Sequence, residues 1–379
     1  MLRKNRKKKI ILVFGTRPEA IKMAPIIKEL QKHREYFKTI ICITAQHREI
    51  LEEVLGLFAI KPDYDLNVMQ DNQSLFDVTT KILLKIKKVL ETERPDLVMV
   101  QGDTTTTFSS SLASFYLKIP LAHIEAGLRT TDKYQPFPEE INRRLTSHLA
   151  DLHFVPTKQA KENLIKEGIS EKFIFLTGNT VVDSLFYILR EIKKRKIKDK
   201  FSFLNSNRKL ILVTAHRREN FGKPLKNICL ALKKIVERNK DIEIVYPVHP
   251  NPNVYNVVTN ILKNTERIHL IRPLDYFSFV YLMSKSYLIL TDSGGIQEEA
   301  PSLRKPILIM REKTERPEVI ESGAAKLAGT DVNYIVKNSE RLLRNKNYYQ
   351  KMSSAINPFG DGRAAQRIIR ILRNLFKHK

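Results

Sequence analysis

Residues capable of binding an anion follow the first apolar run of this chain. Residues 10–14 are apolar and largely β-branched, and Gly15 comes directly after them. Helix-favouring sequence comes next, and it places two cations, Arg17 and Lys22, within about a turn and a half of the helix start. A strand that breaks at a glycine and enters a helix leaves free backbone amides at the helix start, where an anion can bind. The segment therefore predicts a site for a phosphorylated ligand at the edge of a parallel sheet.

Two carboxylates that could perform acid-base chemistry follow later predicted strands. Asp103 comes after the strand 96–101 at a strand-to-helix turn, so it is either a helix N-cap, which is the default, or a catalytic group. Glu125 ends the buried strand 120–124, where a cap does not explain it. Burial raises the pKa of a carboxyl group toward the range useful for proton transfer, so the sequence favours a functional role there.

A third carboxylate, Glu139, lies where a helix is expected to begin. Pro138 suits the first helical position, and the helix dipole favours a carboxylate in the first turn. Glu139 also forms an i,i+4 pair with Arg143, so helix stabilisation explains it without any function. Three carboxylates after neighbouring strands nevertheless suggest an acid-base site. No His/Cys/Asp spacing typical of zinc accompanies them, so we expect no metal.

Two histidines follow strands in the second half of the chain. His216 comes after the strand 209–214, and His249 follows the strand 242–247. Either ring can donate a hydrogen bond to a phosphate, whether neutral or charged. A single histidine in such a place is usually structural, but two at equivalent places favour ligand contact.

The segment TDSGGIQEEA, residues 291–300, predicts a phosphate cradle. Ser293, Gly294 and Gly295 form a turn between a strand and a helix, where backbone amides and one hydroxyl can hold an anion. Glu299, one turn into the helix, could accept hydrogen bonds from a ribose diol. A plain glycine-rich turn is the competing explanation. Arg316 adds charge on the next connection.

Short apolar runs alternate with amphipathic stretches along the whole chain, which is typical of doubly wound parallel sheets. The series thins between about 185 and 208 and begins again at 209. We therefore expect an α/β protein with two Rossmann-like domains, residues 1–177 and 178–358. Residues 359–379 are expected to form a helix that packs back on the first domain. The predicted strands are 10–14, 39–44, 96–101, 120–124, 152–155, 173–177, 209–214, 242–247, 267–271, 287–291 and 306–310.

The formal net charge of this 379-residue chain is +25, which raises the possibility of nucleic acid or acidic membranes as partners. The excess concentrates in residues 3–9, in residues 190–200 and in the final helix. No aromatic platform accompanies the first two runs, and no nucleic-acid recognition motif is found. A solvated basic surface is therefore the favoured explanation, and we expect no specific nucleic-acid partner.

The sequence also favours a cytoplasmic protein. No apolar run approaches the roughly 20 residues that a membrane span needs, and the first apolar run is too short for a secretory signal. Cys42 and Cys229 are isolated in apolar surroundings, as expected of buried thiols in a reducing compartment.

Together these segments closely resemble the non-hydrolysing UDP-N-acetylglucosamine 2-epimerases over nearly the whole chain. The resemblance implies a glycosyltransferase-B-type fold whose two domains face a cleft, a homodimer, a UDP-sugar substrate and no cofactor. The matching strings are GTRPEAIKMAP, TAQHRE, GDTTTT, EAGLRT, PFPEEINR, TGNTVVDSL, TAHRREN, YPVHPNPNV, DSGGIQEEAPS, TERPE and NPFGDG.

The family resemblance also implies a reaction. UDP is eliminated as the proton on carbon 2 is removed, and UDP then adds back to the 2-acetamidoglucal with protonation from the other face. By position in the motifs, the residues of this chain that resemble the family's acid-base group are Asp103, Glu125 and Glu139. The resemblance does not assign which of them removes the proton. The residues that resemble other family residues needed for activity are Lys22, Arg143 and His216. Those that resemble the family's UDP-binding residues are Arg17, His216, Ser293, Gly294, Gly295 and Glu299.

Two alternatives and one departure remain open at this stage. A hydrolysing relative would release UDP and free N-acetylmannosamine on the same scaffold, and a basic nucleic-acid-associated protein is the distant alternative. Some family members bind a second substrate molecule as an activator, near the positions of Gln46 and His47. Glu49 and Asn72 stand here where several such members have Gln and Arg.

Overall fold

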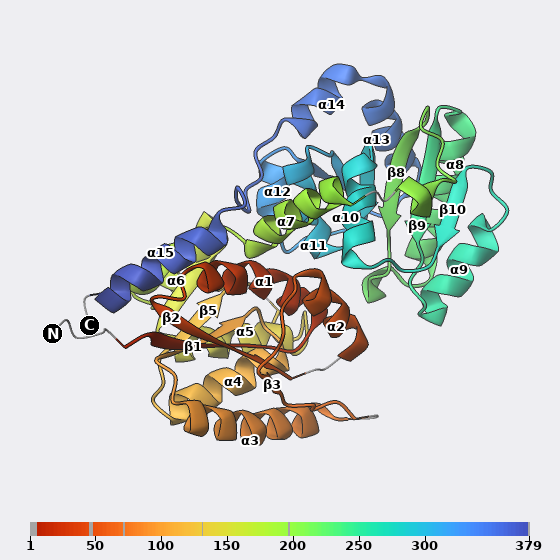
Figure 1. Ribbon diagram of the computed structural model, residues 1–379. Coiled ribbons are helices and arrows are strands. Elements are labelled where there is room, and N and C mark those ends of the chain that lie inside the picture. The colour runs from red at the N-terminus through yellow and green to blue at the C-terminus, as the bar shows by residue number, and fades with distance from the viewer. Residues whose placement is uncertain (1–5, 45–47, 71–72, 131, 196–197, 378–379) are drawn as a thin grey trace. The chain divides into compact units, whose positions relative to one another are not determined.

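The computed structural model describes residues 6–44, 48–70, 73–130, 132–195 and 198–377. The chain divides into two compact units, each built on its own parallel sheet (Figure 1). The first unit runs to Ser184 and resumes at Phe359, and the second is Leu185–Pro358. The prediction of two doubly wound α/β domains is thus confirmed.

The first unit contains a seven-stranded sheet in the order β3-β2-β1-β4-β5-β6-β7, with every neighbouring pair parallel. The order reverses between β1 and β4, which is the switch point where doubly wound sheets bind ligands. The strands are β1 Lys8–Phe14, β2 Phe37–Ile43, β3 Tyr64–Asp65, β4 Leu97–Gln101, β5 Leu121–Ile124, β6 Leu152–Val155 and β7 Ile174–Leu176.

The second unit repeats this arrangement in six strands, ordered β10-β9-β8-β11-β12-β13 and again parallel throughout. Its switch point lies between β8 and β11. The strands are β8 Lys209–Thr214, β9 Ile242–Pro247, β10 Ile268–Ile271, β11 Leu288–Thr291, β12 Ile307–Ile309 and β13 Ala325–Leu327.

Helices cover both faces of each sheet, because the central strands are apolar on both sides. In β1, residues 10–14 are fully buried. Figure 1 shows α1 and α15 over one face of the first sheet and α3 and α4 over the other. The helices of the first unit are α1 Arg17–Lys32, α2 Arg48–Leu57, α3 Leu75–Glu93, α4 Thr105–Tyr116, α5 Glu139–Leu149, α6 Lys158–Lys166 and α15 Ala364–Lys377. Helix α7, Thr180–Lys194, crosses the boundary between the two units. The helices of the second unit are α8 Lys223–Arg238, α9 Pro252–Leu262, α10 Tyr276–Lys285, α11 Gly294–Glu299, α12 Pro317–Glu321, α13 Val332–Arg344 and α14 Lys346–Ser353.

The C-terminal helix α15 packs against α1 within the first unit. Asp183 anchors it, since its carboxylate accepts hydrogen bonds from the amides of Ala364 at 3.1 Å and Ala365 at 2.9 Å. Burial raises the pKa of Asp183 to about 6. Within the described ranges, no helix is both long and apolar enough to cross a bilayer. Both cysteines are buried and unpaired, as predicted.

Three local predictions were wrong. The strands β3 and β13 were not predicted, because neither contains two consecutive apolar residues. Pro138 is the N-cap of α5 rather than its first residue. Asp103 does not cap α4, since the cap is Thr104, whose hydroxyl accepts from the amide of Thr107 at 3.2 Å.

Candidate active site

The turn after β1 is filled by a carboxylate of the protein itself. Glu19 accepts hydrogen bonds from the amides of Gly15 at 3.0 Å and Thr16 at 2.7 Å. Its other oxygen accepts from the hydroxyls of Thr104 at 2.7 Å and Thr107 at 3.2 Å. Burial raises the pKa of Glu19, and these hydrogen bonds offset part of that effect. The sequence predicted free amides at this helix start, but those of Gly15 and Thr16 are not free, because Glu19 accepts both, the Thr16 amide as part of a capping box.

Glycine is required at Gly15 by its neighbours. A Cβ there would lie 2.0 Å from Oγ1 of Thr44 and 2.7 Å from Oγ1 of Thr106. These two hydroxyls are themselves hydrogen-bonded at 2.8 Å. Arg17 begins α1 immediately beyond this turn and is half-buried, so it lies at the switch point of the first sheet.

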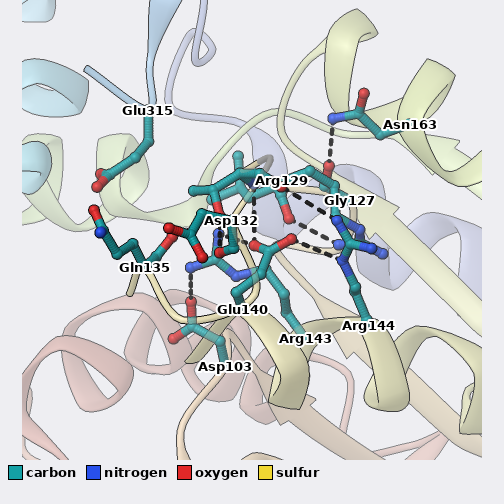
Figure 2. Close-up of polar contacts among 12 residues, drawn as sticks. Asp103, Gly127, Arg129, Asp132, Gln135, Glu140, Arg143, Arg144, Asn163 and Glu315 are labelled. Atoms are coloured by element: carbon teal, nitrogen blue, oxygen red, sulfur yellow. Dashed lines mark hydrogen bonds and ion pairs between the residues drawn. The ribbon is translucent and has the colours of Figure 1, made fainter. Parts of the chain in front are cut away.

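Asp103, in the turn after β4, is held by an arginine from α5 (Figure 2). The Nη2 atom of Arg143 donates to its carboxylate at 2.5 Å. Glu140 is fully buried beneath them and accepts from the amide of Thr130 at 3.0 Å and from Arg144 Nε at 2.8 Å. It also lies 3.4 Å from Arg143 Nη1. Glu140 thus fixes the arginine that orients Asp103.

Glu125 is the most constrained of the predicted carboxylates. Its backbone φ is +63°, a left-handed conformation that side chains other than glycine rarely adopt. The side chain is 8% exposed and forms an ion pair with Lys22. Asn179 Nδ2 donates to its Oε2 at 3.1 Å. Such strain persists where surrounding contacts over-determine the conformation, and it is concentrated at functional sites.

These first-unit residues come together at one edge of the sheet. Asp103 and Glu125 follow the adjacent strands β4 and β5, and Lys22 lies on the helix after β1. Glu139 is the first residue of α5, one turn before Arg143. Gln46 and His47 lie outside the described residues. Across the described part of the chain, no group of three or more His, Cys, Asp or Glu side chains could hold a metal ion.

The second unit also places a buried carboxylate at its switch point. Asp292, which follows β11, accepts the amides of His216 and Arg217, each at 2.8 Å. The same oxygen, Oδ2, accepts from Asn220 Nδ2 at 3.1 Å. The other oxygen has no hydrogen-bond partner among the described residues and lies 3.9 Å from His216 Nδ1.

The two predicted histidines lie side by side. The rings of His216 and His249 stack with centroids 5.5 Å apart and planes 19° apart. Burial lowers the pKa of His216; Asp292 partly opposes this, and Arg217 and His249 add to the lowering. His216 is therefore mainly neutral at pH 7, and it keeps a hydrogen-bond donor on one ring nitrogen.

The turn after β11 presents backbone amides. Ser293 is the N-cap of α11, and Gly294 and Gly295 are its first residues. Among the described residues no acceptor is found for the amides of these two glycines. A Cβ on Gly294 would lie 2.5 Å from Arg316 Nη1, so the close approach of this guanidinium requires glycine there.

Carboxylates hold Arg316 over this turn. Its Nε donates to Glu298 at 2.6 Å and its Nη1 donates to Glu315 at 2.9 Å. Burial alone would raise the pKa of Glu315, but the charges of Arg316 and Arg311 outweigh burial and lower it. Glu299 is buried one turn further along and accepts a hydrogen bond from the hydroxyl of Tyr276.

A family model described as UDP-N-acetylglucosamine 2-epimerase matches residues 28–373. A protein of that name from Campylobacter jejuni is 55% identical over 373 residues, which cover 96% of this chain and 97% of its own. The chain belongs to the UDP-N-acetylglucosamine 2-epimerase family.

Solved structures agree with membership of the UDP-N-acetylglucosamine 2-epimerase family. The chain resembles UDP-GlcNAc 2-epimerase from Neisseria meningitidis bound to UDP-GlcNAc, with a TM-score of 0.91 and 51% identity over 97% of this chain and all of that one. A glycosyltransferase from Rickettsia africae has a TM-score of 0.63 at 15% identity, covering 99% of this chain and all of that one. This second likeness supports the fold alone.

Sequence reasoning missed the roles of three carboxylates and one side-chain amide in this member of the UDP-N-acetylglucosamine 2-epimerase family. They are Glu19, Glu140, Asn179 and Asp292. Glu19 had a readable signal, because Thr16 and Glu19 have the spacing of a capping box. The role of Asn179 had none, since its partner Glu125 is 54 positions away.

Proposed function

We propose that this chain reversibly converts UDP-N-acetylglucosamine to UDP-N-acetylmannosamine by eliminating UDP and adding it back to 2-acetamidoglucal. Family membership supports epimerisation at carbon 2 of this sugar nucleotide. The observation that carries the mechanism is the pairing of carboxylates with cations at one sheet edge. Asp103 pairs with Arg143, and Glu125 pairs with Lys22, after adjacent strands.

The proposed elimination breaks the C2–H bond and gives the proton to a carboxylate, Asp103, Glu125 or Glu139. The electrons of that bond form the C1=C2 double bond, and the C1–O bond breaks with its electron pair leaving on UDP. In the return step UDP attacks C1, and a protonated group delivers a proton to the opposite face of C2. The sequence of steps is redox-neutral and needs no cofactor or metal.

In this proposal the second unit retains UDP while it is a leaving group. The amides of Gly294 and Gly295, the Ser293 hydroxyl and the rings of His216 and His249 are hydrogen-bond donors suited to a diphosphate. Arg316 supplies positive charge over the glycine turn, and Glu299 is assigned to the ribose. Donors of this kind stabilise negative charge as it develops on the leaving oxygen.

We further propose that the chain acts as a cytoplasmic homodimer. Buried, unpaired cysteines suit a reducing compartment. Helices α3 and α4 expose large apolar side chains, including Phe76 at 85%, Phe115 at 57% and Tyr116 at 66%. A second copy of the chain would cover them. Analytical ultracentrifugation tests this, since a monomer at micromolar concentration would contradict it.

The decisive experiment follows the sugar by proton NMR while the protein is incubated with UDP-N-acetylglucosamine in heavy water. We expect UDP-N-acetylmannosamine to accumulate with deuterium at carbon 2 and without net release of UDP. Stoichiometric UDP and free N-acetylmannosamine would instead identify the hydrolysing reaction. An epimerised product without deuterium would contradict proton exchange with a side chain.

A further inference from the structure

A basic cavity lies at the edge of the first sheet opposite the carboxyl ends of its strands. Its volume is about 760 Å³, and residues at the amino-terminal ends of β1 and β2 line it together with the end of α3. The seven residues of β1 rise about 3.3 Å each, so its two ends are roughly 20 Å apart. The cavity is therefore distinct from the site residues that follow the strands.

The lining of this cavity has a large excess of positive charge. Its one carboxylate, Glu93, is already engaged, since it lies 2.9 Å from Lys9 Nζ and accepts from the hydroxyl of Tyr64 at 2.6 Å. The hydrogen bond from Tyr64, followed by Lys9, lowers the pKa of Glu93, which stays ionised. The six cations of the lining are Arg6, Lys7, Lys9, Arg34, Lys38 and Arg94.

Three of these cations have no counter-charge in the described part of the chain. Lys7, Arg34 and Arg94 are exposed and have no described carboxylate within 4.0 Å. Arg6, by contrast, lies 3.6 Å from Asp96. Like charges gathered in a recess repel one another, so an anionic ligand would relieve an electrostatic cost there.

Helix dipoles alone do not account for this excess. Helix α1 ends at Lys32 and helix α3 at Glu93, with Arg94 as its C-cap. Each C-terminus carries about half a negative charge, so two of them balance about one cation. The positive charge of the other lining cations is therefore not balanced by helix C-termini.

The rest of the lining indicates the chemistry of the ligand. Gln31, Thr39 and Thr92 provide uncharged hydrogen-bonding groups. Phe37 is 3% exposed, so it offers no aromatic face on which a nucleobase could stack. The volume lies within the range of about 300–1,000 Å³ usual for small-molecule sites. We propose that this cavity binds an oligophosphate, a chain of at least three phosphate groups, independently of the site for UDP.

Titration calorimetry of the full chain with tripolyphosphate in 0.1 M salt tests the proposal. At this ionic strength the screening length is about 10 Å, so only nearby cations contribute strongly. The test variant is the exposed pair Arg34→Glu/Lys38→Glu, with Arg34→Gln/Lys38→Gln as a milder version. The matched control is Lys88→Glu/Lys166→Glu, which makes the same change in net charge at exposed positions outside the cavity.

We expect the test variant to lose at least tenfold in affinity for tripolyphosphate, the Gln version to lose less, and the control to lose under threefold. Saturating UDP should leave the affinity of the unaltered protein within twofold, whereas ATP should compete through its triphosphate. Equal losses in the test and control pairs would overturn the proposal in favour of general charge attraction. Displacement by UDP would overturn it by assigning the anion to the UDP site. If the Glu pair fails to fold, the Gln pair decides.

Discussion

At the switch point of each sheet a buried carboxylate accepts two backbone amides, but the two carboxylates differ in whether both of their oxygens are hydrogen-bonded. In the first unit, both oxygens of Glu19 are saturated, by two backbone amides and two threonine hydroxyls. In the second unit, Asp292 receives all three of its donors on Oδ2. Its Oδ1 faces His216 instead, at 3.9 Å from Nδ1. A saturated carboxylate can only hold its turn, whereas one with a spare oxygen also acts on the charge of its neighbour.

The side chains near these turns also differ between the two units. The first unit continues with carboxylates that are paired with cations, Asp103 with Arg143 and Glu125 with Lys22. The second continues with donors, the stacked rings of His216 and His249 and the amides of a glycine turn. We infer a division of labour in which the first unit exchanges protons and the second holds the anion.

Neutralising the carboxylates of the first unit should have the largest effect. We expect Asp103→Asn, Glu125→Gln or Glu139→Gln to lower kcat by about 10²–10⁴-fold, because a general acid or base acts in the transition state. UDP should still raise the melting temperature of each variant by mass action. Steady-state kinetics and thermal scans in UDP measure the two quantities.

The control for this series is Glu91→Gln, at a 50% exposed side chain paired with Lys87 on α3. It should leave kcat within twofold. Losses below roughly tenfold in all three carboxylate variants would refute the assignment. A variant that also fails to bind UDP would mark its residue as structural.

The same isosteric change should affect the two switch points unequally. Glu19→Gln places an amide NH₂ group against donors, and a buried donor left without an acceptor costs about 1–3 kcal/mol. For a domain of this size we expect the melting temperature to fall by roughly 3–10 °C. In Asp292→Asn the amide oxygen can keep the three donors while the NH₂ group takes the place of the spare Oδ1, so the cost should be under about 1 kcal/mol. Calorimetric scans that show equal losses would contradict the comparison.

The sequence predicted the outline of this arrangement because parallel strands buried on both faces are continuous apolar runs. Residues 10–14 could be recognised in this way, and so could the residues that follow them. The equivalent places of His216 and His249 after their strands favoured ligand contact, but the stacking of their rings was not predicted. The strands β3 and β13 could not be recognised in this way, because Asp65 and Lys326 leave them without an apolar run.

Contacts that depend on distant parts of the chain could not be predicted. Asn179 shows this, because three of its groups make contacts. Its Nδ2 reaches Glu125, its Oδ1 accepts the amide of Val181 at 3.0 Å, and its own amide donates to the carbonyl of Phe359 at 2.6 Å. No local pattern reports these partners, since only the fold brings the C-terminal segment and β5 to the same residue. For the same reason the strain at Glu125 was not foreseen.

Asn179 offers a smaller test of the proton-transfer edge, as a positioning residue for Glu125. We expect Asn179→Ala to lower kcat about tenfold and to leave KM within threefold. Asn179→Asp keeps the acceptor for Val181 but turns a negative charge toward Glu125, so it should lower kcat at least as much while costing less in melting temperature. If both losses follow the melting temperature instead, Asn179 is only structural.

The smallest expected effect concerns the spare oxygen of Asp292. The pKa of His216 lies below its ordinary value of 6.5, mainly because of burial, and the charge of Asp292 partly raises it. Asp292→Asn removes that charge and presents an NH₂ group to Nδ1, which favours the neutral ring. The pKa of His216 should therefore fall further. Two unit charges about 4 Å apart interact by about 1 kcal/mol in water, so for a ring that is 39% exposed we expect a downward shift of about half to one pH unit.

The measurement is an NMR titration of the histidine ring carbons in the free protein, with the His216 signal assigned by its loss in His216→Gln. Working without UDP avoids the titration of the diphosphate itself. The matched control is Asp241→Asn, an exposed carboxylate of the same unit that pairs with Lys209. It should leave the midpoint of His216 within about 0.2 pH unit, because exposed charges beyond a screening length are damped. Since a ring that is neutral in the folded state and charged in the unfolded state costs stability only in acid, the variant should also lose stability at a higher rate as pH falls below 6.5. A midpoint that stays in place or moves upward would show that Asp292, like Glu19, does no more than hold its turn.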